Sequence, residues 1–219
     1  MPRLLFEKSG NAVWISHLDL MRFFQRAFKR AGLPLTHTNG FNPRPSVSIA
    51  LPLSVGVESQ CELLDFELEE KSASNEEICQ RLNEVLVPGI HVISVYDNGR
   101  KLRDLALLRC IISFTYDNGI PEGTLNAIET LFSSDTLCVP KKTKNGIQEQ
   151  NIIPMIREFS ITQTGQRNII LDAVVCCQNP TLNPMLLGTA VEMYLPERKP
   201  DACSYCRVEL YDMNLNIFR

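Results

Sequence analysis

The sequence lacks the motifs by which self-sufficient enzymes are usually recognised. It contains no P-loop, no G-x-G-x-x-G, no H-E-x-x-H and no G-x-S-x-G. Nucleotide hydrolysis, dinucleotide binding, zinc-dependent proteolysis and serine-hydrolase chemistry therefore have no visible signature. No apolar run approaches the ~20 residues of a membrane span. We expect a protein without a membrane segment that is not an enzyme on its own.

Net positive charge is also missing. The formal net charge is -3 over 219 residues, whereas a stand-alone nucleic-acid-binding domain is usually basic. The charge is unevenly distributed, because residues 1–50 carry seven Lys or Arg against two acidic residues and the remainder carries 15 against 23. Any contact with an anionic ligand is therefore expected in the N-terminal portion.

Eight cysteines are present, but no signal peptide precedes Arg3-Leu-Leu-Phe-Glu-Lys8. We therefore expect a cytoplasmic protein with reduced thiols. Most of the cysteines lie singly or adjacent among apolar residues, where a thiol behaves as a small hydrophobe. Cys203 and Cys206 form a C-x-x-C pair that suits half a zinc site or a redox pair, but no second pair stands at ribbon spacing. We expect neither a metal nor another cofactor.

One stretch combines charge, aromatic residues and helical periodicity. Ser16 can cap a helix that begins at about residue 17, and Gly32 can end it. Apolar residues recur at helical spacing along one face of residues 17–31. Another face of the same helix is basic and carries Arg22, Arg26, Lys29 and Arg30.

The turn Gly40-Phe-Asn-Pro-Arg-Pro45 follows this helix and contains two prolines, which stiffen it. Arg44 adds one more cation, and Asn42 adds a hydrogen-bonding group. Phe41 suits a stacking surface for a base or, equally, a core residue beneath the turn. The sequence thus predicts an RNA- or anion-binding site at Arg22, Arg26, Lys29, Arg30, Phe41, Asn42 and Arg44.

Two further features have competing interpretations. The Asn-Gly pair of the basic turn Lys141-Lys-Thr-Lys-Asn-Gly146 favours a solvated hairpin tip. Alternatively, this turn is a secondary phosphate-binding site formed by Lys141, Lys142 and Lys144. His17, at the start of the predicted helix, is a weak candidate for general acid–base catalysis on RNA. A hydrogen-bonded structural role is the alternative for this imidazole.

The element order predicts an α+β protein of two tandem ferredoxin-like (βαββαβ) units with antiparallel sheets. The units are expected at residues 1–98 and 104–219, separated by a polar segment. Strands are expected at 3–8, 12–15, 34–38, 47–53, 63–68 and 90–96 in the first unit and at 109–116, 136–139, 168–177 and 205–211 in the second. Helices are expected at 17–31, 76–86, 121–132 and 183–193.

Several motifs resemble those of the bacterial radical-SAM-linked protein family, a domain of unknown function. They are Ile15-Ser-His-Leu-Asp-Leu20, Arg26-Ala-Phe-Lys-Arg-Ala-Gly-Leu-Pro34, Gly40-Phe-Asn-Pro-Arg-Pro45 and Leu51-Pro-Leu-x-x-Gly-Val57. Members are encoded beside, or fused to, a B12-binding-type radical SAM protein, often near genes for ribosomal proteins and an E/G-type ribonuclease. The chain departs from the family pattern at Asn151, where Asp is usual, and lacks an Arg before Pro184.

The resemblance implies an accessory role near RNA or translation. We therefore expect a radical-SAM-linked protein that binds RNA, such as tRNA or rRNA, or another anionic ligand, and presents it to a radical SAM enzyme encoded nearby. One alternative is a metal-independent RNA-processing enzyme of the repeat-associated ribonuclease type. Another is a structural protein–protein interaction module, in which the cations pair with carboxylates of residues 58–70.

Overall fold

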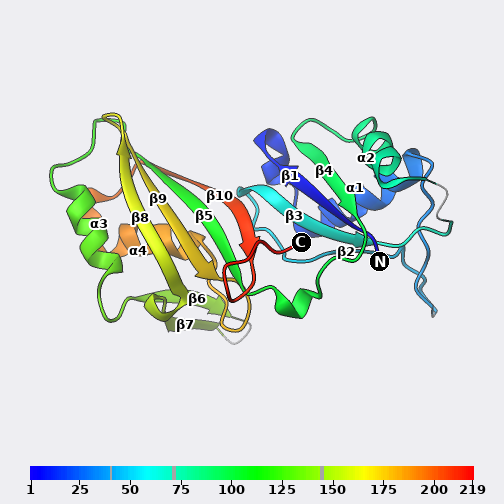
Figure 1. Cartoon of the computed structure of the whole chain (residues 1–219). Helices are drawn as coiled ribbons and strands as arrows, with labels where there is room; N and C mark the ends of the chain where they lie inside the picture. Colours follow the sequence, from blue (N-terminus) through cyan, green and yellow to red (C-terminus); the bar gives the residue numbers. More distant parts are fainter. Residues whose placement is uncertain (40, 71–72, 144–145) are drawn as a thin grey trace. The chain divides into compact units, whose positions relative to one another are not determined.

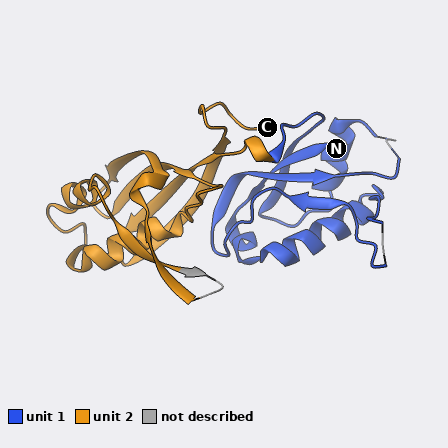
Figure 2. Ribbon diagram, turned by 90° about the horizontal axis from the view of Figure 1, so that it is seen from below, with its two compact units in different colours: residues 1–102, 219 blue, residues 103–218 orange. Residues whose placement is uncertain are grey.

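The computed structural model describes the chain except residues 40, 71–72 and 144–145. It is an α+β structure with antiparallel strand pairing and four α-helices among the described residues (Figure 1). The chain forms two compact units, residues 1–102 with Arg219 and residues 103–218, which Figure 2 shows in different colours. The α+β class and the antiparallel pairing predicted from the sequence are confirmed.

The first unit has a four-stranded arrangement in the order β4-β1-β3-β2, and each neighbouring pair is antiparallel. Its elements are β1 (Arg3–Lys8), the 3-10 helix η1 (Gly10–Trp14), α1 (His17–Arg30), β2 (Val47–Ile49), β3 (Glu58–Phe66), α2 (Asn75–Asn83) and β4 (Ile90–Tyr96).

Local chemistry sets the bounds of both helices in this unit. The Ser16 side chain accepts a hydrogen bond from the Asp19 amide, and Gly32 takes a left-handed φ of 67° just after α1. Ser74 and Glu77 form a reciprocal capping box at the start of α2. These caps satisfy backbone groups that a helix end leaves without partners.

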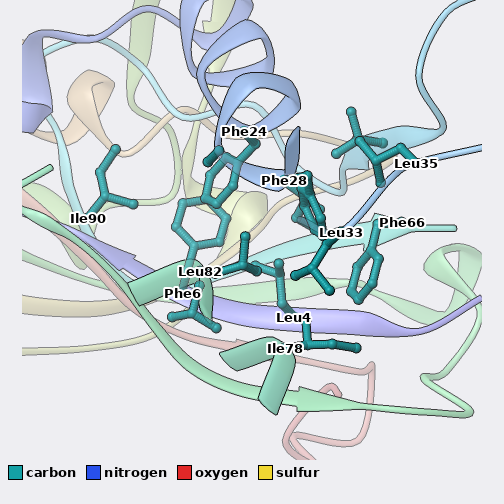
Figure 3. Packing of buried hydrophobic residues seen from close by; sticks show 14 of the residues in the cluster. Leu4, Phe6, Phe24, Phe28, Leu33, Leu35, Phe66, Ile78, Leu82 and Ile90 are labelled. Atoms are coloured by element: carbon teal, nitrogen blue, oxygen red, sulfur yellow. The ribbon is translucent and has the colours of Figure 1, made fainter. Parts of the chain in front are cut away.

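Both helices cover the same face of the first unit's sheet. Phe24 and Phe28 from α1 meet Phe6 and Phe66 from the strands, with ring centroids 4.8 Å apart for Phe6 and Phe24 and 4.9 Å for Phe28 and Phe66. Leu82 from α2 joins the same cluster (Figure 3). These side chains are fully buried, so the apolar stripe of α1 is turned inward and its basic positions outward.

The second unit has the strand order β10-β5-β9-β8, again antiparallel at every pair, and a separate hairpin of β6 and β7. Its elements are the 3-10 helix η2 (Leu102–Asp104), which begins in the first unit, β5 (Leu107–Thr115), α3 (Thr124–Phe132), β6 (Cys138–Thr143), β7 (Gly146–Asn151), the 3-10 helix η3 (Ile153–Met155), β8 (Ile156–Thr164), β9 (Asn168–Cys176), α4 (Met185–Tyr194), the 3-10 helix η4 (Pro196–Arg198) and β10 (Ala202–Tyr211).

Helices α3 and α4 pack on one face of this sheet. The Phe132 ring of α3 lies 6.0 Å from the Phe159 ring of β8. The Tyr205 side chain of β10 reaches Gly188 of α4. The strand register places Phe159 and Tyr205 on the same face, because side chains alternate along each strand and match across each pair.

Two local expectations from the sequence are wrong. Residues 12–14 are not extended, because residues 10–14 form η1. Residues 34–38 form no strand and contribute only isolated bridges at Leu35 and His37. The sequence reasoning also overlooked β8, and the expected strand at 136–139 belongs to the β6–β7 hairpin. Most residues of β8 are exposed. A strand with a solvated face contains fewer apolar residues, and its sequence is therefore harder to identify as a strand.

Candidate functional site

The outer face of α1 carries a row of cations, Arg22, Arg26 and Lys29, which we call the cationic row. All three side chains are exposed. At about 100° per residue, they lie within roughly 60° of one another on the helix. The core residues Leu20 and Phe24 lie on the opposite side, so folding of the core fixes the direction in which the row faces.

Within the described residues, the row forms one ion pair, at its first member. Arg22 Nη1 lies 3.1 Å from Asp19 Oδ1, and both side chains are more than 60% exposed. A hydrogen bond from Ser16 lowers the pKa of the Asp19 carboxyl below its usual range, and the Arg22 guanidinium lowers the pKa further. Such an exposed pair contributes little to stability. Arg22 can therefore exchange Asp19 for a phosphate at small cost.

Arg30, the remaining predicted cation of α1, has a structural contact. Its Nη2 donates a hydrogen bond of 2.8 Å to the carbonyl of Val85, just after α2. This contact joins the end of α1 to the end of α2. We therefore separate Arg30 from the cationic row, since its replacement would alter packing as well as charge.

The proposed pairing of these cations with residues 58–70 is not observed in the described part of the chain. Asp65 binds Arg3 instead, at 2.6 Å. Glu67 accepts a hydrogen bond from the Thr36 hydroxyl at 3.1 Å. Within the described residues, Lys29 and Arg44 form no ion pair. The positive charge of the surface is thus not cancelled by the acidic strand.

The turn after α1 places its predicted residues at the surface. Phe41, Asn42 and Arg44 are all exposed, and the Phe41 ring has no cover at all. Phe41 is therefore not a core residue. The Thr38 amide donates to the Arg44 carbonyl at 2.8 Å, and the Arg44 amide donates to the Thr38 hydroxyl at 3.0 Å. Gly40 lies outside the described residues.

Trp14 is a surface residue that the sequence reasoning did not include in the site. It ends η1, two residues before the cap of α1, and is 71% exposed. The six-membered part of its indole lies against Gly56, where a Cβ would be 3.4 Å from Cζ3. The signal that could have identified it is that this is the only tryptophan of the chain, directly before the cationic helix.

A buried lysine fixes the backbone on both sides of Trp14. Lys8 is 1% exposed, and its Nζ donates to the carbonyls of Val13 at 3.1 Å and Ile15 at 2.9 Å. The Val13 carbonyl also accepts from the Gly56 amide at 2.9 Å. Burial lowers the pKa of Lys8, while the nearby Glu62 carboxylate opposes this shift. The segment that carries Trp14 is consequently held at several points.

The other predicted candidates are dispersed. His17 is the first residue of α1 and is partly buried. Lys141 donates to the Thr181 carbonyl at 3.3 Å, so it has a structural contact in the second unit. Lys142 lies in β6, and Lys144 lies outside the described residues.

All eight cysteines are free thiols. Cys203 and Cys206 stand three positions apart on β10, where they pair with Phe114 and Ile111. An odd spacing along a strand directs the two side chains to opposite faces, so they do not form one chelating pair. In the described part of the chain, no three His, Cys, Asp or Glu side chains are grouped as a metal site would require.

The second unit contains a polar depression of about 430 Å³ on the sheet face away from its helices. Arg109 and Asp172 form a two-point ion pair there, with 2.8 Å between Nε and Oδ1. The pairing raises the pKa of the Arg109 guanidinium. Because the Arg109 guanidinium and the Asp172 carboxylate neutralise each other, we interpret this pair as a structural contact between β5 and β9.

These features define an α+β protein with an exposed cationic helix and an exposed tryptophan at the start of that helix. Residues 2–184 match the family described as "Uncharacterized protein conserved in bacteria (DUF2344)", and the chain belongs to this family. The predicted bacterial domain family is therefore confirmed at this level. No curated protein matches the sequence. No helix in the described residues has both the length and the apolar character to cross a bilayer.

Among solved structures, a chain in the crystal structure of a Cbf5-Nop10-Gar1 complex is similar, with a TM-score of 0.53 and 8% identity over 95% of this chain. The chain spans about half of that structure's chain, 48%. An H/ACA RNP bound to a substrate RNA and an archaeal box H/ACA sRNP Nop10-Cbf5 complex have TM-scores of 0.47 and 0.46, each at 8% identity over 94% of this chain and 46% of theirs. The first similarity concerns the fold alone, and no conclusion rests on the other two.

Proposed function

We propose that this protein is an accessory module that binds RNA through the cationic row of α1, assisted by Phe41 and Arg44, and presents it to a radical SAM enzyme. The single observation that carries the RNA proposal is the row itself, three exposed cations opposite the core of α1. An RNA backbone supplies closely spaced phosphates, whose condensed counterions are released on binding.

The net negative charge of the whole chain fits a local rather than a global RNA contact. The cations of residues 1–50 concentrate the attraction at α1 and the following turn, and the acidic remainder disfavours binding elsewhere. The radical SAM partner is an expectation from the family resemblance. An exposed row of cations suits a substrate-presenting role.

We further propose that each unit is a variant of the ferredoxin-like motif. The orders β4-β1-β3-β2 and β10-β5-β9-β8 follow the same rule, in which the first strand lies between the third and the fourth. The β6–β7 hairpin is then an insertion before the second strand of the later unit. The similarity to the chain of the Cbf5-Nop10-Gar1 complex concerns the fold. It does not support the proposal that this protein binds RNA.

The test is charge reversal in the cationic row, with Arg26→Glu and Lys29→Glu combined. Binding of fluorescently labelled bulk bacterial tRNA should weaken about tenfold or more, and the dependence of log K on log salt should become shallower as phosphate contacts are lost. The free energy of unfolding should change by less than about 0.5 kcal/mol, since both side chains are solvated. Binding is measured by anisotropy between about 50 and 200 mM salt.

The matched control reverses two exposed arginines elsewhere, Arg81→Glu and Arg167→Glu. It changes the net charge by the same amount and should leave more of the affinity intact. Equal losses in the two double variants would show that only net charge matters, and the site assignment would then be wrong. Loss of stability without loss of binding would instead favour a structural role for the row.

A further inference from the structure

We propose that Trp14 is a stacking platform for an unpaired base, so that the RNA bound by the cationic row is single-stranded at the start of α1. This inference rests on the RNA-binding function proposed above and specifies its substrate class. The structure supports it through the exposure of Trp14, the contact of its ring with Gly56, and its place just before the cationic helix α1.

A large aromatic side chain is normally covered in a folded protein, and Trp14 is not. It is 71% exposed, and Leu18 in the first turn of α1 is 67% exposed. Val55, next to Gly56, is 46% exposed. Trp14 is the largest of these three exposed apolar side chains. A single base is of a size to cover one indole, and stacking tolerates any base because every base has a π-face.

The indole is supported from below. Gly56 has a left-handed φ of 83°, and its missing side chain lets the Trp14 ring approach the backbone. A residue with a side chain would be strained in this backbone conformation, and its Cβ would touch the ring at 3.4 Å from Cζ3. Lys8 holds the carbonyls before and after Trp14, as described above. A ring held in this way loses little conformational freedom when a ligand stacks on it, which favours binding.

The cations lie on the side of α1 that also carries the exposed Leu18, and Trp14 stands three residues before this helix begins. Leu18 and Arg22 are four residues apart, Arg22 and Arg26 again four, and Lys29 follows three residues later. Residues at these spacings lie above one another on a helix, and 1.5 Å per residue gives about 16 Å from Leu18 to Lys29. A strand with one base on Trp14 could thus place its following phosphates along the cationic row. An aromatic platform beside a positive track is the arrangement by which proteins bind single strands.

The experiment compares an oligouridylate of about 12 nucleotides with an RNA duplex of the same length, using anisotropy and intrinsic fluorescence. Trp14 is the only tryptophan, so its emission reports this site alone, and a stacked base quenches indole emission. The single strand should quench Trp14, whereas the duplex should bind without quenching. Trp14→Ala should weaken single-strand binding about tenfold, as expected for the loss of one stacked base, and leave duplex binding unchanged.

Trp14→Phe is the matched variant, because it keeps an aromatic face and should retain most of the affinity. The thermal midpoints of the Trp14 variants show that each remains folded. Suppose that the oligouridylate binds through Arg26 and Lys29, but Trp14→Ala changes neither its affinity nor the ratio of single-strand to duplex affinity. The stacking platform is then refuted, while the RNA-binding function stands. That result would assign the patch to a protein partner. If no RNA binds to the wild-type chain, both proposals fail.

Discussion

Replacing Lys8 with Met should destabilise the first unit by about 3 kcal/mol at neutral pH. Methionine fills similar space, so the main losses are electrostatic. The Glu62 carboxylate, which is 1% exposed, loses the nearby ammonium group, and the Ile15 carbonyl loses its 2.9 Å hydrogen bond. Removing one member of a buried charge pair costs about 3–5 kcal/mol. Replacing lysine also removes the free-energy cost of burying its charge, so we expect a loss at the low end of this range.

Urea unfolding followed by Trp14 emission reports the first unit and is the appropriate assay. Adding Glu62→Gln to Lys8→Met should recover at least about 1 kcal/mol, because it removes the buried negative charge that has lost the Lys8 ammonium group. Lys29→Met is the matched control at an exposed position of α1 and should change stability by less than about 0.5 kcal/mol. A loss below about 1 kcal/mol for Lys8→Met, or no recovery in the double variant, would refute the reasoning.

The same substitution has a pH signature. Because burial lowers the pKa of Lys8 in the folded state, the unfolded chain binds this proton more tightly than the folded chain. The free energy of unfolding therefore gains a contribution that rises with pH between the lowered pKa and the unfolded value of about 10.4. The difference between wild type and Lys8→Met should grow over this window. Other alkaline titrations cancel in that difference, and a flat or falling difference contradicts the assignment.

Two further outcomes concern the second unit. Gly188→Ala should destabilise it by about 1–2 kcal/mol, because the new Cβ would overlap the Tyr205 hydroxyl oxygen and overpacking exceeds the helix-propensity gain. Adding Tyr205→Phe should reduce this loss in a double-mutant cycle, and purely additive losses would show that the contact is not the cause. Burial raises the pKa of Cys110 and of Cys177 to about 12. Both thiols should therefore resist a thiol reagent at mildly alkaline pH until denaturant is added, as measured by mass spectrometry. Labelling of either thiol at the rate of an exposed thiol would contradict this prediction.

Much of α1 could be predicted because its determinants are local. Ser16 caps the helix, Gly32 follows its end in a left-handed conformation, and the apolar residues between them repeat at the helical period. The same reasoning places the basic residues on the outer face. It could not show that Arg30 binds the Val85 carbonyl, since that partner comes from a distant part of the chain.

The strands were predicted less evenly, and their exposure explains why. Residues 90–96 and 168–177 have buried apolar positions and were identified with nearly correct bounds. Strand β8 was overlooked because most of its side chains face solvent, so few apolar residues mark it. Strand pairing itself depends on contacts between remote segments. The sequence suggested the repeated element order, and only the structure supplied the register of each pair.

The sequence by itself determined the charge of α1 and the direction in which its cations face, because a helix needs only its own residues to define an apolar and a basic side. Tertiary structure decided whether that charge stays uncancelled, since Asp65 is bound by Arg3 rather than by a cation of α1. It also decided the state of Trp14 and Lys8. Average preferences favour a covered tryptophan and an exposed lysine. In the fold, Trp14 remains 71% exposed although its ring touches Gly56, and Lys8 is buried because the Val13 and Ile15 carbonyls accept its hydrogen bonds.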